Sequence, residues 1–205
     1  MADFTEPGVV VTEEDQIRAN VYGLLGALLT RPPDKEIIAL LREIDVDEKQ
    51  QASAMAASWK TLNLAAKRRR LNELNDEYHN LFIGVGRGEV VPYGSWYLTG
   101  FMMDRPLAQL RQDLIDLGLE RAEHVKEPED HAGALCESMS LLLSIDDGIT
   151  PHVQKRFFDN HIASWMTKFF EDLQTASSAD FYKAVGALGE QFIELEKQYL
   201  DMLPH

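Results

Sequence analysis

Apolar side chains recur at alternating steps of three and four near the end of the chain, at Phe181, Val185, Leu188, Phe192, Leu195 and Tyr199. An α-helix turns once in 3.6 residues, so this spacing places all of them along one side of a single helix. Such a helix is stable only when other elements cover its apolar side. The pattern therefore predicts a long helix that is buried along one face, and the rest of the chain must supply its cover.

The same periodicity runs through most of the remaining sequence, and no segment shows convincing strand alternation. We expect helices after Thr12 and Asp34, from near Asp47, over 71–82, 107–117 and 128–145, and from Pro151 to Leu173. The predicted fold class is all-α, with a single compact bundle of about eight to ten helices formed by residues 1–205. Residues 1–100 and 101–205 could form two halves of this domain, joined by a loop at 84–100.

The chain carries 34 acidic and 20 basic residues, which gives a formal net charge of −14. Such a surface repels phosphate backbones and anionic lipid, so nucleic acid and direct membrane insertion are not expected, whereas cationic peptides are attracted. Solubility alone is the alternative reason for an acidic surface. The one basic run, Lys67 to Arg70, is expected on a solvated helix face, paired with Glu73 or Glu77.

Cys136 is the single cysteine, so the chain can form neither an internal disulfide nor a cysteine-based metal cage, which suits a reducing compartment. The first residues, Met1 to Glu6, lack the basic start and apolar run of a secretory signal. No apolar stretch approaches the roughly 20 residues of a membrane span. These features predict a cytoplasmic protein.

Glycines at positions 84, 86, 88, 94 and 100 interrupt the helical pattern. They predict a long ordered loop, a feature that is usually functional in compact domains. A phosphate-binding loop is disfavoured, because Glu89 stands where a dinucleotide fingerprint needs glycine and no Walker lysine is present. The residues that follow predict either a peptide or ligand groove or an aromatic plug over the core: Pro92, Tyr93, Trp96, Tyr97 and Phe101.

Residues 127–131 read Glu-Pro-Glu-Asp-His ahead of an apolar run. Pro128 fits the first turn of a helix, so Asp130 and His131 are expected at the start of that helix in a shared, partly exposed position. Carboxylates there offset free N–H groups, which accounts for Asp130 but not for His131. A metal site is disfavoured because adjacent residues leave a helix about 100° apart and His124 lies outside it. No activated serine or cysteine accompanies the pair, so no catalytic residue is predicted.

Three motifs, in this order, resemble the TorD/DmsD family of redox-enzyme maturation chaperones. They are Tyr78-x-x-Leu81-Phe82-x-Gly84-x-Gly86, Pro92-Tyr93-Gly94-Ser95-x-Tyr97 and Glu127-Pro128-x-Asp130-His131. Val85 and Val91 depart from the pattern, since many members carry proline there. Each motif is short, and their order and separation make the combination specific.

The resemblance implies a TorD-like helical fold that binds the twin-arginine signal peptide and precursor of a molybdenum-cofactor enzyme. Such a chaperone assists maturation, holds the client back from premature export and then releases it to the translocase. The resemblance implies no cofactor of its own, although some members are linked to weak guanine-nucleotide binding and some form a domain-swapped dimer instead of a monomer. The peptide-binding residues that it places on this chain are Leu81, Phe82, Pro92, Tyr93, Asp130 and His131, with Ser95, Trp96 and Glu127 beside them.

The residue chemistry suits that expectation. A guanidinium prefers a carboxylate partner, which Asp130 would supply with Glu127 or Glu129, while the apolar residues receive the apolar part of the signal. Protonation of His131 would add a charge that repels the arginines. Two alternatives stay open: a nitrate-reductase-type assembly factor that recognises a non-exported client, and a small helical metal-dependent hydrolase that uses Asp130 and His131.

Overall fold

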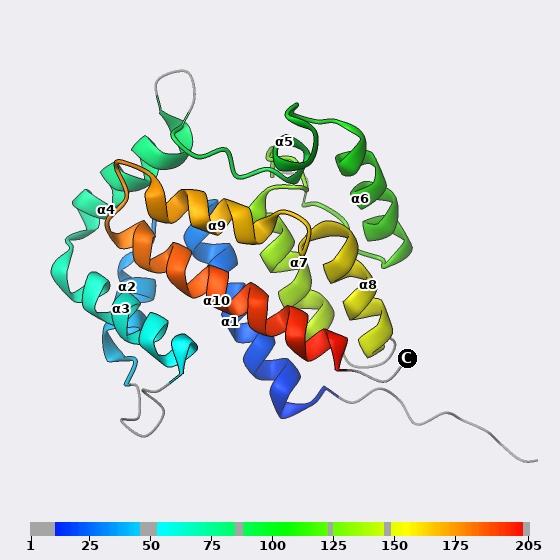
Figure 1. Ribbon diagram of the computed structural model, residues 1–205, viewed down its shortest axis with the longest axis horizontal. Helices are drawn as coiled ribbons and strands as arrows, with labels where there is room; N and C mark the ends of the chain where they lie inside the picture. The colour runs from blue at the N-terminus through cyan, green and yellow to red at the C-terminus, as the bar shows by residue number, and fades with distance from the viewer. Residues whose placement is uncertain (1–10, 46–52, 85–87, 123–124, 146–148, 203–205) are drawn as a thin grey trace, which may run out of the picture.

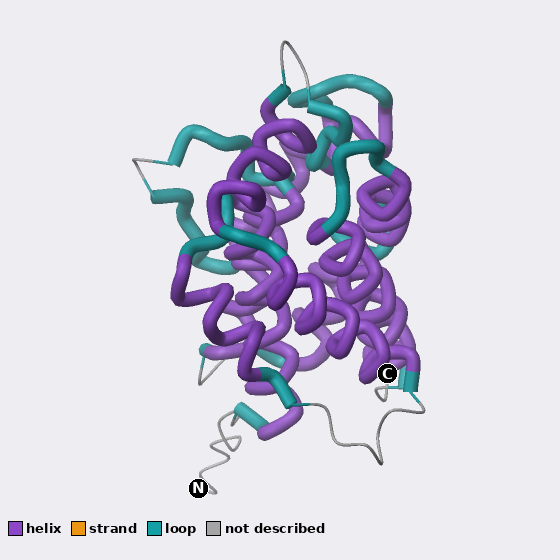
Figure 2. The backbone as a smooth tube through the Cα atoms, turned by 90° about the vertical axis from the view of Figure 1, so that its left-hand side faces the viewer, coloured by secondary structure: helices purple, strands orange, loops and turns teal. Residues whose placement is uncertain are grey.

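The computed structural model describes residues 11–45, 53–84, 88–122, 125–145 and 149–202. Every regular element in these ranges is helical, which confirms the predicted all-α class (Figures 1 and 2). The elements are α1 (Glu13–Thr30), α2 (Lys35–Glu43), α3 (Ala54–Arg68), α4 (Leu71–Tyr78), the π-helix η2 (His79–Ile83), α5 (Gly94–Thr99), α6 (Arg105–Asp116), α7 (Ala132–Ser144), α8 (Pro151–His161), α9 (Met166–Thr175) and α10 (Phe181–Asp201).

The core forms where these helices cross. α1 packs against α7, and α10 packs against α9 and α3, so the long C-terminal helix is covered as its periodicity requires (Figure 1). Tyr22, Leu25 and Leu188 are among the side chains with no exposed surface. A Cβ at Gly133 would lie 2.5 Å from Thr30 Cγ2, so α1 and α7 approach each other closely only because that position is glycine.

A buried ion pair ties three helices together. The Arg18 guanidinium on α1 donates from Nε and Nη2 to the two carboxylate oxygens of Glu196 on α10, over 2.7 and 2.9 Å. It also donates to Gln154 on α8 over 3.0 Å and to Asp15 over 2.8 Å. Because a buried charge is tolerated only when it is paired, this network fixes how α1, α8 and α10 meet.

Several helix starts were predicted correctly. Thr12, Asp34 and Thr150 each cap the helix that follows, with the side-chain oxygen accepting a backbone N–H. The third helix begins later than predicted, after the Ser53 cap. Asp47, where it was expected to begin, lies outside the described residues.

Three expectations about where helices occur and where they break are wrong. The Gly-rich segment contains a short helix, α5. The segment from Pro151 divides into α8 and α9, because the Trp165 indole donates to the His161 carbonyl over 2.7 Å and the chain leaves the helix at Ile162. The basic run spans the break between α3 and α4 rather than lying within one helix, although the expected Arg70–Glu73 pair is present at 2.9 Å.

Among the described residues, none of the helices combines the length and the hydropathy needed to cross a bilayer.

Candidate functional site

The two segments that carry the second and third motifs lie side by side. The Gly94 N–H donates to the Asp130 carbonyl over 2.9 Å, and the Ala132 N–H donates to the Pro92 carbonyl over 2.8 Å. The Asp130 side chain adds a bond from the Ser95 N–H to Oδ2 over 2.8 Å and a second, short one from the Ser95 hydroxyl. Residues that lie more than 30 positions apart in the sequence therefore form one structural unit at the start of α5.

This pairing explains why the helix after Pro128 begins later than predicted. The backbone of His131 is extended and forms an isolated antiparallel bridge with Tyr93, so α7 begins only at Ala132. His131 is its N-cap residue, and Nδ1 of the ring accepts the Gly133 N–H over 3.1 Å. Asp130 and His131 do lie at the start of this helix, as predicted, but Pro128 is not in its first turn, and the bridge to Tyr93 helps to fix their position.

Asp130 and His131 are also buried, with exposed fractions of 3% and 5%, where partial exposure was expected. The His131 ring packs edge-on against Tyr93, with ring centroids 5.1 Å apart. Burial lowers the pKa of His131 to about 4 and outweighs the nearby carboxylates of Glu127 and Asp130, which act to raise it. The imidazole is therefore neutral at pH 7, and the expected repulsion of arginines by a protonated His131 does not apply there.

One oxygen of Asp130 is left without a partner. Oδ2 accepts both bonds from Ser95, whereas Oδ1 is buried and has no hydrogen-bond partner in the described part of the chain. Asp130 lines a hollow of about 460 Å³ together with Gly94, Leu135, His161 and Trp165. Since an unpaired buried carboxylate oxygen costs free energy, a donor that reached it from this hollow would gain a strong hydrogen bond.

A separate, apolar hollow of about 390 Å³ is lined in part by residues of the segment 92–96. We call it the aromatic hollow, and its lining includes Phe82, Ile83, Pro92, Tyr93, Trp96 and Met102. Ile83 and Met102 are 57% and 41% exposed, so apolar surface faces solvent here. Of the predicted binding residues, Phe82, Pro92, Tyr93 and Trp96 line it. Leu81 is fully buried beneath, and Ser95 is bonded to Asp130.

Two carboxylates near the Tyr93 side of the aromatic hollow differ in their partners. Glu127 is exposed and accepts a short hydrogen bond from the Tyr93 hydroxyl, which holds that ring in place. Burial, and this carboxylate second, raise the pKa of Tyr93 above its usual value, so the phenol stays protonated. Glu129 is already paired with Arg111 at 2.9 Å and Arg121 at 3.6 Å. Glu127 is thus the carboxylate at this edge best placed to receive a cation.

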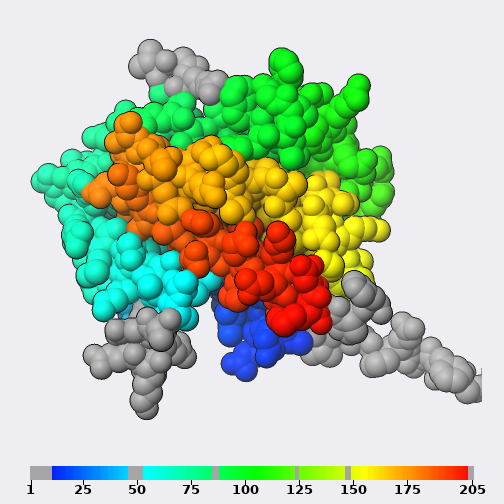
Figure 3. Space-filling view, in the orientation of Figure 1, coloured from blue at the N-terminus to red at the C-terminus, as the bar shows by residue number. Residues whose placement is uncertain are grey.

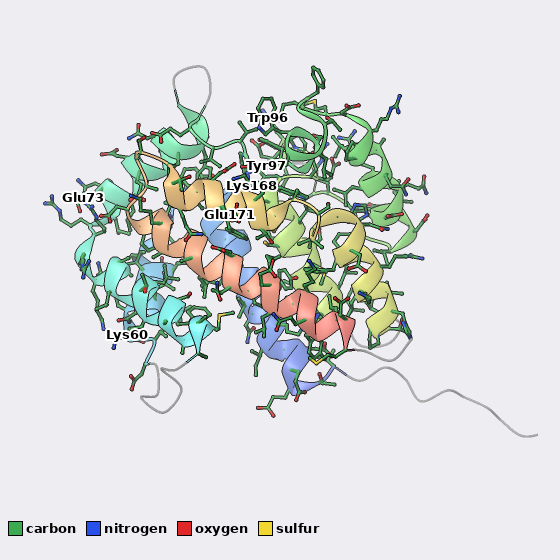
Figure 4. All side chains as sticks on the ribbon, in the orientation of Figure 1. Lys60, Glu73, Trp96, Tyr97, Lys168 and Glu171 are labelled. Atoms are coloured by element: carbon green, nitrogen blue, oxygen red, sulfur yellow. The ribbon has the colours of Figure 1, made fainter. Side chains whose placement is uncertain are left out.

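A third hollow, more polar and of about 460 Å³, shares Trp96 with the aromatic hollow and extends to α9. Tyr97 and Asp172 form part of its wall, and the Tyr97 hydroxyl donates to Asp172 over 3.0 Å. Figure 4 shows Trp96 and Tyr97 of α5 beside Lys168 of α9, whose ammonium lies 2.8 Å from the Asp172 carboxylate. Asp172 was not predicted, and nothing in the sequence near it indicates a site.

The described residues that follow the glycine run lie against the π-helix η2, since the Val90 N–H donates to the Leu81 carbonyl over 2.9 Å. A Cβ at Gly88 would collide with the same carbonyl, so glycine there permits close approach of these two backbone segments. Residues 85–87, which include Gly86 and Val85 of the first motif, lie outside the described residues, as does His124.

The remaining candidates for a metal-binding or reactive residue are His, Cys and acidic side chains. In the ranges that the structure describes, no three His, Cys, Asp or Glu residues come together in a way that could hold a metal ion. Cys136 is fully buried, and burial raises the pKa of its thiol, so it is a packing residue. His161 contacts Asp113 over 2.7 Å between α8 and α6. Its ring is buried, which lowers its pKa.

Known proteins share both this fold and this sequence pattern. A crystal structure of a protein assigned as a redox enzyme maturation protein from Archaeoglobus fulgidus superposes with a TM-score of 0.58 over 92% of this chain and 99% of its own, at 18% identity. The fold is therefore that of the helical redox-enzyme maturation proteins.

The family follows from the sequence. The profile described as "Nitrate reductase delta subunit" matches residues 48–171, and the chain belongs to that family. Its relatives include the chaperone protein TorD of Shewanella oneidensis, 28% identical over 90% of each chain. TorD of Vibrio cholerae is 24% identical over 91% of this chain and 93% of its own. A "Probable Tat proofreading chaperone DmsD" of Haemophilus influenzae is 26% identical over 82% and 85%. The resemblance to the TorD/DmsD family is confirmed.

Proposed function

We propose that this protein is a maturation chaperone that binds the twin-arginine signal peptide of a molybdenum-cofactor oxidoreductase precursor in the cytoplasm and delays its export. The names of the TorD and DmsD relatives support the chaperone class. One observation carries the proposal to this chain: the bonds between Ser95 and Asp130 hold the segment that lines the aromatic hollow against the segment that carries Glu127 and Asp130.

The aromatic hollow receives the apolar part of the signal. Tyr93 and Trp96 offer ring surface on a segment that Asp130 anchors, and Phe82 adds a ring from η2, so little ordering of the protein is needed on binding. Burial of roughly 300 Å² of apolar peptide surface would contribute about 7 kcal/mol before the entropic costs of association. Apolar burial therefore provides most of the affinity.

The carboxylates receive the arginines. Glu127 is exposed at the edge of the aromatic hollow, and Asp130 has one oxygen without a partner on the neighbouring hollow. Charge-assisted hydrogen bonds between guanidinium and carboxylate contribute about 1.5–3 kcal/mol each when shielded. The net charge of −14 attracts the basic signal over longer range, so charge provides association rate and specificity.

Isothermal titration calorimetry with a synthetic twin-arginine signal peptide tests the proposal. We expect Trp96→Ala to weaken binding at least tenfold, because the ring forms a wall of the aromatic hollow. Phe101→Ala is the matched control: this ring belongs to the same aromatic run, is 70% exposed and does not line the hollow, so affinity should change less than twofold. A peptide with Lys-Lys in place of Arg-Arg should bind several-fold more weakly. Equal affinity of the two variants, or no binding by the wild type, would refute the proposal.

Asp130→Ala combined with His131→Ala is a poor test of contact. Both side chains are buried and hold the start of α5 and α7, so their removal would displace the aromatic hollow as well as remove a carboxylate. Variants of residues that line the aromatic hollow, such as Trp96→Ala, test contact with the peptide and leave the bonds of Asp130 and His131 in place.

The family description favours one second candidate, an assembly factor that recognises a nitrate reductase lacking an exported signal. The discriminating measurement is binding of a client polypeptide from which the signal has been deleted. Full affinity for the truncated client supports the assembly factor, and loss of binding supports the signal-peptide chaperone.

A further inference from the structure

A second apolar groove is lined by the first half of α1, the start of α3 and the second half of α10. These parts of the three helices lie at the end of the molecule away from α5 (Figure 1). We call it the α1–α10 groove. It has a volume of about 320 Å³ and its lining includes Ile17, Val21, Trp59, Leu195 and Tyr199. In Figure 3 the first turns of α1 are open to solvent between α3 and the last turns of α10.

The apolar side chains here are unusually exposed. Ile17 is 58%, Leu195 50% and Met202 76% exposed, although each lines the groove. None of the three belongs to the buried core, so the stability of the bundle does not account for their apolar character. Contiguous exposed apolar surface of this kind marks an interaction site.

The walls favour a helical partner. All three walls are α-helices whose N–H and C=O groups bond within the helix, so the groove offers an extended peptide no backbone to pair with. Ile17 and Val21 on α1, and Leu195 and Tyr199 on α10, repeat at a spacing of four and form ridges that another helix can pack against. Met202 at the rim is flexible and adapts to different side chains.

The charges favour a basic partner. Among the described residues, the lining carries one cation, Arg18, which is already paired with Glu196 on the lining and with Asp15. Glu14 also lines the groove, so its acidic residues outnumber its basic one. A second copy of the chain would bring the same acidic surface and a net charge of −14, so self-association is opposed by repulsion.

We propose that the α1–α10 groove docks an amphipathic helix of another protein, whose apolar face is flanked by Lys or Arg. The groove shares no lining residue with the aromatic hollow, so both sites can be occupied at once. The proposal does not depend on the nature of the peptide that binds at α5.

The test is fluorescence anisotropy with a labelled 18-residue peptide of Leu and Lys, in which Leu recurs at helical spacing. We expect it to bind the full chain, and binding should weaken at least tenfold in the double variant Ile17→Ser, Leu195→Ser. The matched control, Leu40→Ser with Ile115→Ser, removes side chains that are 57% and 66% exposed elsewhere and should change affinity less than twofold. Glu14→Lys should weaken binding several-fold at low salt and less at high salt. Circular dichroism checks that each variant is folded.

Three results would overturn the proposal. The double variant could bind as tightly as the control variant, which would place the peptide elsewhere. A peptide with Glu in place of Lys, or one of scrambled order, could bind equally well, which would remove the stated chemistry. Sedimentation could show a wild-type dimer that Ile17→Ser with Leu195→Ser dissociates, which would make a second copy the occupant.

Discussion

Asp130 has different surroundings at its two carboxylate oxygens. Oδ2 accepts the N–H and hydroxyl of Ser95 and so fixes the first turn of α5, while Oδ1 has no partner among the described residues. A buried acceptor without a partner lowers the stability of the free protein by about 1–3 kcal/mol. A ligand that donates to Oδ1 recovers that free energy, so the residue both positions the aromatic hollow and favours a cationic guest.

His131 makes the stability of the protein depend on pH. Its pKa is lowered to about 4 in the folded state, so between the ordinary histidine pKa and pH 4 the unfolded chain binds a proton that the folded chain does not. Stability is therefore full above the unfolded pKa and falls as the pH decreases. We expect wild type to lose about 3 kcal/mol more than His131→Asn between pH 7 and pH 4, measured by urea unfolding.

His131→Asn is a suitable reference because its side-chain oxygen can still accept the Gly133 N–H and cap α7. The carboxylates that titrate in the same range are common to both proteins, so they cancel in the difference. Parallel stability curves for the two proteins would show that His131 does not remain neutral in the folded state.

Among the elements, α10 is capped from another helix. Its own N-cap residue, Asp180, provides no side-chain cap bond. The carboxylate of Glu77 on α4 instead accepts the N–H groups of Asp180 over 2.7 Å, Tyr182 over 2.8 Å and Phe181 over 3.2 Å. Three otherwise unpaired donors at the positive end of the longest helix are thus satisfied by one carboxylate.

Glu77→Ala should therefore lower the free energy of unfolding by about 2–3 kcal/mol, because it leaves buried N–H groups without acceptors. Glu73→Ala on the same helix is the control: its carboxylate pairs at the surface with Arg70, so its loss should lower the free energy of unfolding much less than Glu77→Ala does. Chemical denaturation of both variants gives the comparison. Equal losses would mean that the cap from α4 does not stabilise α10.

Local signals predicted the elements whose boundaries are set locally. The Thr12, Asp34 and Thr150 caps each act on the residues directly after them, so the sequence around them is sufficient. The start of α7 and the presence of α5 depend on bonds between segments distant in the sequence, such as Gly94 to Asp130. Periodicity contains no information about such bonds, and the prediction that α7 begins at Pro128 failed for that reason.

For the whole molecule, the motifs predicted segments that the fold brings together but not where each side chain lies. Phe82, Tyr93 and Trp96 line the aromatic hollow, whereas Leu81 is fully buried and Asp130 lines the neighbouring hollow. Burial depends on the packing of several helices together, which the sequence pattern of one segment cannot reveal. The buried Arg18–Glu196 pair, 178 residues apart, was missed for the same reason.

Hydrogen–deuterium exchange of the full chain, with and without a saturating twin-arginine signal peptide, shows where the peptide binds. We expect slower exchange at residues 88–100 and 127–133, around the aromatic hollow and Asp130. We expect no change at residues 13–21 and 192–202, which line the α1–α10 groove at the other end of the molecule. Protection confined to that groove, or absent from residues 88–100, would contradict this expectation.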